Sequence, residues 1–330
     1  MIELSVVIPI RNEAPSIAEL HRELTHTLDA WGRPYEIIVV DDGSTDESFG
    51  ILARMQAVDP RLRVIRFRRN FGQTAAFAAG FASARGRLVA TSDGDLQNDP
   101  GDIPGMIETL DKGRYDIVCG WRKSRKDAFF SRLVPSMIAN RLISWATGVR
   151  LHDYGCSLKV FRAEVVKPLK LYGEMHRFIP AIASEQGVAM TEVAVNHRPR
   201  RHGRSKYGIS RTVPVILDLL TVKFMLSYST RPLQIFGLIG FAMGALGAAI
   251  TLYLAYVRLT GQQAIANRPL LFFGGLLVIT GVQLVTLGLL AEVQVRTYHE
   301  SQNKPTYVIR EILESEPVSA RERVASLADN

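Results

Sequence analysis

The sequence has little cysteine and lacks the glycine-rich fingerprints of two large enzyme classes. Its two cysteines, Cys119 and Cys156, lie far apart and match no zinc-ligand spacing. A reduced, cytosolic setting is the simplest inference. No G-x-G-x-x-G follows the first predicted strand, and no G-x-x-x-x-G-K occurs. These absences count against a dinucleotide-binding enzyme and a P-loop enzyme.

Charge is missing from two long apolar runs late in the chain. Residues 233–257 and residues 270–291 contain no Asp, Glu, Lys, Arg or His, and they are 25 and 22 residues long. A helix needs about 20 apolar residues to cross a bilayer. A pair of buried core helices is the alternative, but basic or aromatic residues at the ends of both runs favour membrane spans.

The distribution of basic residues predicts how the spans are oriented. Residues 200–231 carry seven Lys or Arg, whereas the link between the spans carries only Arg258 and Arg268. Basic residues also follow the second span, so both termini are predicted to be cytosolic. Apolar positions at helical spacing over 209–228 predict a helix lying along the membrane surface. Gly240-x-x-x-Gly244 allows close approach of helices, and small residues in the spans are compatible with contacts between subunits of a homo-oligomer.

Strand-like and helix-like segments alternate through the first part of the chain. Apolar strands are predicted over residues 4–10, 35–40, 62–67 and 115–120, with another beginning at residue 88. Ser16 with Glu19, and Ser44 with Glu47, match capping boxes that would open helices. Further helices are predicted over residues 70–84 and 102–112, and later strands follow Gly155 and cover residues 190–195. This alternation predicts an α/β domain with a mostly parallel sheet and right-handed crossovers.

Acidic residues follow several of these strands. Asp93-Gly94-Asp95 ends the apolar run that starts at residue 88, Asp41-Asp42 ends the second strand, and residues 9–13 (PIRNE) end the first. Carboxyl ends of parallel strands share one edge, where open α/β sheets bind ligands. Two carboxylates on a glycine turn suit Mg²⁺ or Mn²⁺, with the other ligands supplied by water and a diphosphate.

The net charge of +8 is concentrated in two basic patches, at residues 122–132 and 198–211. Nucleic acid is one interpretation of such patches. The second patch lies just before a membrane segment, so anionic lipid heads or a phosphate-bearing lipid fit better, and no nucleic-acid partner is expected. The amphipathic segment after the first patch, up to residue 150, suits core packing and membrane contact equally.

Four stretches resemble family 2 glycosyltransferases of the polyprenyl-phosphate type: residues 7–13 (VIPIRNE), 39–46 (VVDDGSTD), 93–100 (DGDLQNDP) and 203–207 (GRSKY). With the two spans, the resemblance extends to about residue 312. Residues 153–156 (DYGC) are similar to an element of bacterial undecaprenyl-phosphate formamido-arabinose transferases, and the wider group includes glucosyl- and galacturonosyltransferases. The Q-x-x-R-W motif of the polymerising synthases does not occur, which favours transfer of a single sugar.

The resemblance implies a GT-A fold over residues 1–208, the surface helix over 209–230, the two spans within 231–295, and a cytosolic tail over 296–330 whose last residues are predicted to be disordered. It also implies a nucleotide sugar, a polyprenyl phosphate and Mg²⁺ or Mn²⁺ as substrates and cofactor. Nucleotide-binding positions match Pro9, Asn12, Glu13, Asp41, Asp42 and Asp93. Metal positions match Asp93, Asp95 and Gln97. Positions facing the acceptor phosphate match Gln97, Arg125, Arg200, Ser205 and Lys206.

The implied reaction is inverting transfer from a nucleoside diphosphate sugar, UDP by the bacterial resemblance, to undecaprenyl phosphate at the bacterial inner membrane. Catalytic roles fall on Asp95, Asp153 and Arg122. Several roles stay open: Asp153 is either a general base or a loop-ordering carboxylate, Glu13 either binds nucleoside or leads a helix, and the basic loop either binds phosphate or anchors the protein to lipid. Transfer to a lipid hydroxyl, or a non-enzymatic subunit of a lipid-linked sugar flippase, are the competing functions.

Overall fold

The computed structural model describes residues 1–123, 143–144, 147–171, 175–199, 232–261, 269–301 and 306–314. These residues fall into two units, one made of Met1–Val222 with Pro305–Asn330 and the other of Lys223–Lys304. Arg125 and the stretch 200–231, which holds Arg200, Ser205, Lys206 and the predicted surface helix, lie outside the described residues.

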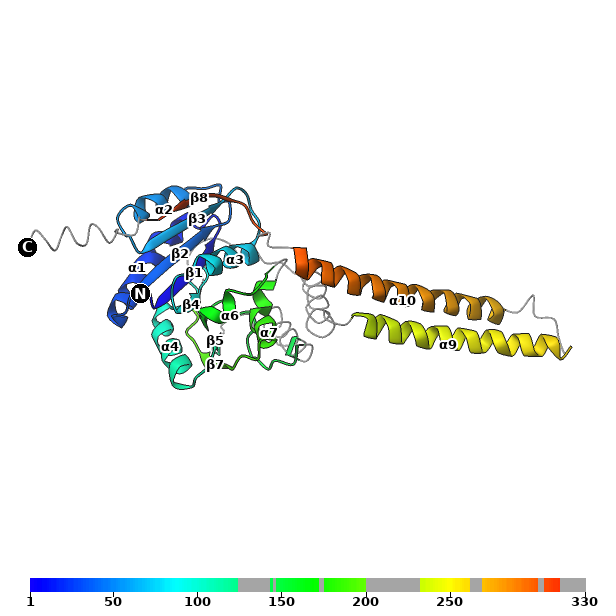
Figure 1. Ribbon diagram of the computed structural model, residues 1–330. Helices are drawn as coiled ribbons and strands as arrows, with labels where there is room; N and C mark the ends of the chain where they lie inside the picture. The colour runs from blue at the N-terminus through cyan, green and yellow to red at the C-terminus, as the bar shows by residue number, and fades with distance from the viewer. Residues whose placement is uncertain are drawn as a thin grey trace, which may run out of the picture. The chain divides into compact units, whose positions relative to one another are not determined.

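The first unit is built on a mixed sheet whose eight described strands run in the order β7-β5-β6-β4-β1-β2-β3-β8 (Figure 1). The strands are β1 (Leu4–Ile10), β2 (Tyr35–Asp41), β3 (Leu62–Phe67), β4 (Leu88–Thr91), β5 (Ile117–Trp121), β6 (Lys159–Arg162), β7 (Met190–Ala194) and β8 (Ile309–Leu313). The pairs β1–β2, β1–β4, β2–β3 and β5–β7 are parallel. The predicted α/β fold with a mostly parallel sheet is confirmed.

Two strands are antiparallel to their neighbours, and the alternation of elements does not foresee them. β6 inserts between β4 and β5 and runs against both. β8 comes from the segment that follows the second apolar run and pairs with β3 at the sheet edge. An ion pair between Arg63 Nε and Glu314 Oε2 (2.8 Å) and stacking of Tyr307 on Phe67 (5.2 Å between ring centroids) fix this edge. The segment treated as a tail from the sequence thus carries a strand of the sheet.

Helices cover both faces of the sheet, because β1 and β2 are mostly apolar and are buried along their whole length. The described helices of this unit are α1 (Ala14–Trp31), α2 (Ser48–Gln56), α3 (Gln73–Ser83), α4 (Ile103–Lys112), α6 (Ala163–Val166) and α7 (Ile179–Ser184), with short 3-10 turns η1 (Pro100–Asp102) and η3 (Met175–Phe178). The apolar residues of α1, α2 and α4 share one core with β1 and β2. α3 packs on the opposite face, where Gly80 lies against Val7.

The face of α1 predicted from its spacing is the buried one, formed by Ile17, Leu20, Leu24 and Leu28. The predicted start of this helix is wrong. α1 begins at Ala14, with a proline in its first turn, and Ser16 is buried inside the helix rather than capping it. Proline is favoured in the first turn because its missing N–H would be unpaired there anyway.

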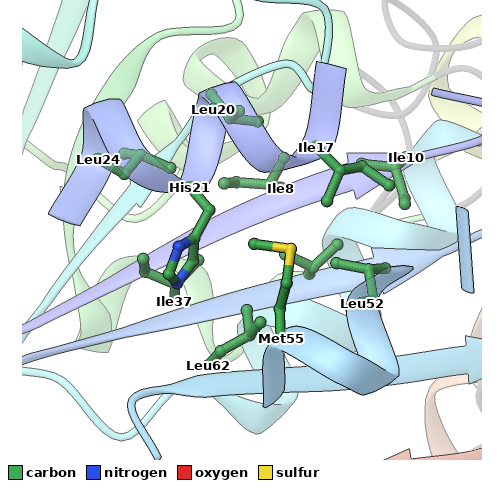
Figure 2. A pocket seen from close by; sticks show the side chains of 11 residues that line it. Ile8, Ile10, Ile17, Leu20, His21, Leu24, Ile37, Leu52, Met55 and Leu62 are labelled. Carbon is green, nitrogen blue, oxygen red and sulfur yellow. The ribbon is translucent and has the colours of Figure 1, made fainter. Parts of the chain in front are cut away.

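A small apolar void lies between α1 and the sheet (Figure 2). Its volume is about 10 Å³, and His21 on α1 and Met55 on α2 are among the side chains that line it. His21 Nε2 pairs with Asp59 Oδ2 at 3.0 Å, so the ring is held by a partner outside the void. A space this small, with apolar walls, barely admits one water. It is a packing defect of the core and not a ligand site.

The second unit consists, in its described residues, of α9 (Pro232–Leu259) and α10 (Pro269–Ser301), which lie side by side (Figure 1). Both contain stretches long and apolar enough to cross a membrane, Phe236–Leu259 and Pro269–Ala291. Only 17% and 11% of the residues in their most apolar windows are buried, which disfavours the alternative of core helices. The pair makes this a membrane protein.

Glycines form the seam between α9 and α10. A Cβ added to Gly240 would lie 2.6 Å from the carbonyl oxygen of Gly281, and one added to Gly247 would lie 2.7 Å from that of Gly274. Both distances are too short for any side chain, so the helix backbones touch at these points. Gly240 of the Gly240-x-x-x-Gly244 pattern is therefore used within the hairpin, and a Cβ on Gly281 would meet Gly244 as well.

Candidate functional site

The loops after β1, β2 and β4 meet at one edge of the sheet, as predicted from their positions after parallel strands. β1 lies between β2 and β4 in register with both. The backbone N–H of Asp42 donates to the carbonyl of Ile10 (2.9 Å), which joins the first two loops directly. A Cβ on Gly94 would lie 2.7 Å from Cγ2 of Ile10, so the third loop packs on the first. Only glycine fits between Asp93 and Asp95 without displacing the Ile10 side chain.

The loop after β1 is bound to the loop after β2 by polar contacts. Asn12 adopts a left-handed backbone (φ 52°), its N–H donates to Ser44 Oγ (2.9 Å), and its side-chain oxygen accepts from the N–H of Thr45 (2.8 Å). The N–H of Glu13 donates to Ser48 Oγ (3.0 Å). Ser44 therefore does not cap α2, which begins at Ser48, and the predicted second capping box is wrong. Glu13 occupies the N-cap position of α1 without a side-chain capping bond.

Asp41 and Asp42 hold two different turns. Asp41 is fully buried: its Oδ1 accepts from the N–H of Ser44 (2.9 Å), and its Oδ2 lies 3.8 Å from Nε of Arg66. Asp42 accepts from the backbone N–H groups of Phe71 (2.6 Å) and Gly72 (3.0 Å), just before α3. Burial raises the pKa of Asp42, and those two donors oppose the rise.

These contacts bring the start of α3 to the same sheet edge. Gly43 has φ +65°, and a Cβ there would lie 2.6 Å from the carbonyl carbon of Arg69. The turn after β2 thus packs directly on the loop that leads into α3. Pro9, a nucleotide position predicted from the sequence, is buried within β1 and pairs in register with Val40.

Asp93 and Asp95 differ in how they are held. Both oxygens of Asp93 accept hydrogen bonds, Oδ1 from Gln73 Nε2 (2.9 Å) and Oδ2 from Ser157 Oγ (2.7 Å). Asp95 Oδ1 accepts from the N–H of Gln97 (3.1 Å). Burial and then the Asp95 carboxylate raise the pKa of Asp93, because two negative charges share a site of low polarity.

This donor set fits a divalent cation. Within the described ranges no group of three or more His, Cys, Asp or Glu side chains could surround a metal ion. Asp93 and Asp95 nevertheless lie in one turn, where their like charges repel each other, and a cation would relieve this repulsion. Mg²⁺ and Mn²⁺ typically take one or two carboxylates and complete their shell with water and substrate phosphates.

Gln97 joins the carboxylate turn to the segment that leads into the basic loop. Its carbonyl accepts from the N–H of Arg198 (2.9 Å), and its side-chain amide lies 3.4 Å from both His197 Nε2 and the carbonyl of Arg198. Asn98 forms an antiparallel bridge with His197. The guanidinium of Arg198 pairs with Glu23 (2.6 Å) and with a carboxylate of the turn, Asp99 (2.8 Å). His197 and Arg198 are therefore attached to the carboxylate turn.

Arg122 and Asp153 form a buried two-point ion pair. Nε and Nη2 of Arg122 donate to Oδ2 and Oδ1 of Asp153 at 2.7 and 2.9 Å, and Gly155 N–H donates to Oδ1 at 3.1 Å. Burial lowers the pKa of Arg122, but the hydrogen bond and charge of Asp153 raise it overall. Glu192 on β7 accepts from the N–H groups of His152 and Asp153 and fixes this loop. The Asp153 carboxylate is thus engaged by Arg122 and by the N–H of Gly155 in its own turn.

Sequence reasoning missed Gln73, Ser157 and Glu192, which hold the site's carboxylates and loops. Gln73 opens a helix predicted from its alanine content, and Ser157 directly follows the DYGC element. A polar residue at the first position of a helix on this edge was the one available signal. Glu192 lies in a short strand whose place beside β5 is set by the fold alone.

Comparison with known proteins agrees with this geometry. Residues 5–169 match the model of glycosyl transferase family 2. The chain is 47% identical over 320 residues to a dodecaprenyl-phosphate galacturonate synthase of Rhizobium johnstonii, covering 96% of this chain and 94% of the relative. It is 38% identical over 313 residues to an undecaprenyl-phosphate 4-deoxy-4-formamido-L-arabinose transferase of Edwardsiella ictaluri, covering 94% of each chain.

A solved structure shares the fold at low identity. Glucosyl-3-phosphoglycerate synthase from Mycobacterium tuberculosis, in complex with Mn²⁺, UDP and phosphoglyceric acid, superposes with a TM-score of 0.53 at 17% identity. The match covers 68% of this chain and 78% of that one. Since the family model covers half of the chain and the two relatives nearly all of it, the chain belongs to glycosyl transferase family 2.

Proposed function

We propose that this membrane-bound glycosyltransferase moves one sugar from a nucleoside diphosphate sugar to polyprenyl phosphate, with inversion at the anomeric carbon. The observation that carries the proposal is the direct link between Gln97 and Arg198, because Arg198 precedes the basic loop by two residues in the sequence and is bonded to the carboxylate turn. The names of the two relatives describe transferases and synthases of polyprenyl-phosphate-linked sugars, which supports this acceptor over the alternatives.

The donor would lie across the edge formed by the loops after β1, β2 and β4. Pro9, Asn12, Glu13, Asp41, Asp42 and Asp93 are the proposed nucleotide positions. Because Asn12, Asp41 and Asp42 hold neighbouring turns, their contribution is to fix the shape of the nucleoside pocket. A uridine nucleotide is proposed, and the Mn²⁺–UDP complex of the structural neighbour is consistent with it.

Asp93 and Asp95 would hold Mg²⁺ or Mn²⁺ against the diphosphate, and Gln97 shapes the turn between them and the acceptor. When bound, the cation neutralises the negative charge that develops on the departing diphosphate. The chain's own part is to keep the two carboxylates fixed and facing the donor. Asp95 has one oxygen on Gln97 N–H, and its side chain is almost fully buried in a turn that only glycine at 94 permits.

The acceptor needs little help from a base. An oxygen of the polyprenyl phosphate forms a bond to the anomeric carbon, the bond from that carbon to the diphosphate breaks, and the nucleoside diphosphate leaves with the electron pair. The second pKa of a phosphate monoester is about 6, so the nucleophile is already ionised near neutral pH. The engagement of Asp153 by Arg122 favours its loop-ordering role over a base, and a lipid hydroxyl acceptor would require a base.

Cations must instead bring the acceptor anion beside the donor anion. Arg125, Arg200, Ser205 and Lys206 are the proposed acceptor-phosphate residues, and Arg122 backs this edge as the partner of Asp153. Arginine suits bidentate phosphate contact. The two candidate spans would hold the enzyme at the membrane that contains its lipid acceptor. The proposed orientation has both termini on the cytosolic side of the bacterial inner membrane, and the counts of basic residues support it. A homo-oligomer is also proposed, through surfaces other than the glycine seam.

Purified protein in detergent, with Mn²⁺, undecaprenyl phosphate and a panel of nucleotide sugars, tests this function. Mass spectrometry is expected to detect a lipid-phosphate-linked sugar from one donor of the panel, and Asp95→Asn is expected to abolish it. The names of the relatives make UDP-galacturonate and the UDP-linked formamido-arabinose the first donors to try. If Asp95→Asn left the rate unchanged, the metal role would be wrong, and product on a lipid hydroxyl instead would overturn the acceptor.

A further inference from the structure

Ser157 occupies a position between the carboxylate turn and the start of β6. Its hydroxyl accepts from Asn98 Nδ2 (2.7 Å) and donates to Asp93 Oδ2 (2.7 Å). An amide nitrogen is only a donor, and a hydroxyl has only one proton. The contact with Asn98 therefore commits that proton to Asp93.

The backbone around Ser157 is held by two side chains that the proposed mechanism does not use. Thr91 Oγ1 donates to the carbonyl of Ser157 (2.6 Å). Lys159, which is 4% exposed, donates through Nζ to the carbonyl of Cys156. A buried ammonium group is costly unless it is bonded. Lys159 and Thr91 together hold the peptide units on the two sides of Ser157.

Asp93 is oriented from its other side by α3. Gln73 Nε2 donates to Oδ1 at 2.9 Å, so each carboxylate oxygen has one donor from the protein. Donors on both oxygens fix the rotation of the carboxylate about its own axis, which a single bond would not do. Outer partners that orient a ligating carboxylate typically change metal affinity 10–100-fold when they are removed.

We propose that Ser157 is a positioning residue, which sets the orientation in which Asp93 meets the metal–diphosphate group of the donor. This inference rests on the proposed metal role of Asp93 and Asp95. Removing the hydroxyl would leave Asp93 Oδ2 and Asn98 Nδ2 without the contact that joins them, while the strands and the apolar core keep every contact they have. The effect should therefore fall on donor binding and turnover and spare the lipid acceptor.

The test compares Ser157→Ala, Ser157→Thr and Asp95→Asn in full-length protein in detergent. Ser184→Ala is the matched control, because it deletes a hydroxyl that donates to a backbone carbonyl on α7 (Ser184 Oγ to Ala181, 2.6 Å). Binding of Mn²⁺ in the presence of UDP is followed by electron paramagnetic resonance of the free ion. Steady-state constants are measured for donor and for undecaprenyl phosphate, and thermal unfolding confirms that each variant is folded.

Ser157→Ala is expected to weaken Mn²⁺ binding about tenfold or more and to lower kcat/KM for the donor, with the KM for lipid unchanged. Ser157→Thr keeps the hydroxyl and should recover most of the loss, and Ser184→Ala should behave like the wild type. If Ser157→Ala bound Mn²⁺ normally while Asp95→Asn did not, the positioning role would be refuted and the metal site retained. If Asp95→Asn also bound Mn²⁺ normally, the metal assignment itself would fail, and this proposal with it.

Discussion

Arg122 donates two hydrogen bonds to the carboxylate of Asp153, at 2.7 and 2.9 Å, and the two side chains are 12% and 4% exposed. Gly155 N–H also donates to this carboxylate at 3.1 Å, so both of its oxygens are held. The pair holds the loop that precedes β6. Ser157, four residues after Asp153 in this loop, donates a hydrogen bond to Asp93. Arg122 and Asp153 are thus connected to the proposed donor site through residues 153–157.

A double-mutant cycle on Arg122 and Asp153 measures how strongly the two side chains stabilise each other. Arg122→Ala and Asp153→Ala are each expected to destabilise the protein by roughly 2–3 kcal/mol, because each leaves one largely buried charge without its partner. Arg122→Ala/Asp153→Ala should lose less stability than the sum of the two, since neither charge remains. Apparent Tm values in detergent provide the measurement. Strictly additive changes in Tm would contradict the coupling.

Arg198 is expected to act as an anchor of the basic loop and not as a phosphate ligand, because its guanidinium already pairs with Glu23 and Asp99. Arg198→Ala should raise the KM for undecaprenyl phosphate about fivefold, the equivalent of about 1 kcal/mol, and change the donor KM less. Lys112→Ala is the control, since Lys112 pairs with Glu108 on an exposed helix surface. A change confined to the donor KM would mean that Arg198 supports binding of the donor and not of the lipid acceptor.

Lys206 tests the acceptor loop itself. A charge-assisted hydrogen bond to phosphate contributes about 1.5–3 kcal/mol, so Lys206→Ala should raise the lipid KM about 10-fold or more with a smaller effect on the donor. Steady-state kinetics with each substrate varied in turn measure both constants. Equal changes in the two KM values would reject the loop as the acceptor site, and a loss that anionic lipid restores would identify membrane anchoring instead.

The glycine seam of the hairpin predicts a steric effect within α9 and α10. Gly281→Leu should lower the apparent Tm in detergent, since a Cβ there would lie 2.5 Å from the carbonyl oxygen of Gly240, and overpacking of this kind costs about 1–3 kcal/mol. Gly275→Leu is the control, because a Cβ at that position meets no atom of another described segment within 4 Å. Equal Tm values for the two variants would mean that the helices do not pack along this seam.

Much of the fold follows from local patterns, and the exceptions have identifiable causes. The buried face of α1 follows from helical spacing, and the shared edge of the acidic loops follows from parallel strands. Capping boxes at Ser16 and Ser44 failed because tertiary contacts prevailed: Ser44 Oγ is used by Asn12 of another loop. Alternation of elements gives their order but not their pairing, so the antiparallel β6 and β8 could not be foreseen.

The candidate site divides in the same way. Acidic residues that follow strands are visible in the sequence, so the sequence predicts that Asp42, Asp93 and Asp95 lie at one edge of the sheet. What orients them comes from distant segments: Gln73 lies 20 residues before Asp93, and Ser157 lies 64 residues after it. No local pattern marks a serine or a glutamine for such a contact, because its geometry exists only once β4 and β6 are paired.

Pairing of β8 with β3 has a consequence for biogenesis. The strand is encoded after both apolar helices, yet it completes the edge of a sheet whose other strands all precede them. During synthesis, the edge of β3 stays unpaired until the chain that follows α9 and α10 has left the ribosome. The ion pair between Arg66 and Glu311 also forms only then. The sheet of the catalytic domain is therefore completed only after both apolar helices have been synthesised.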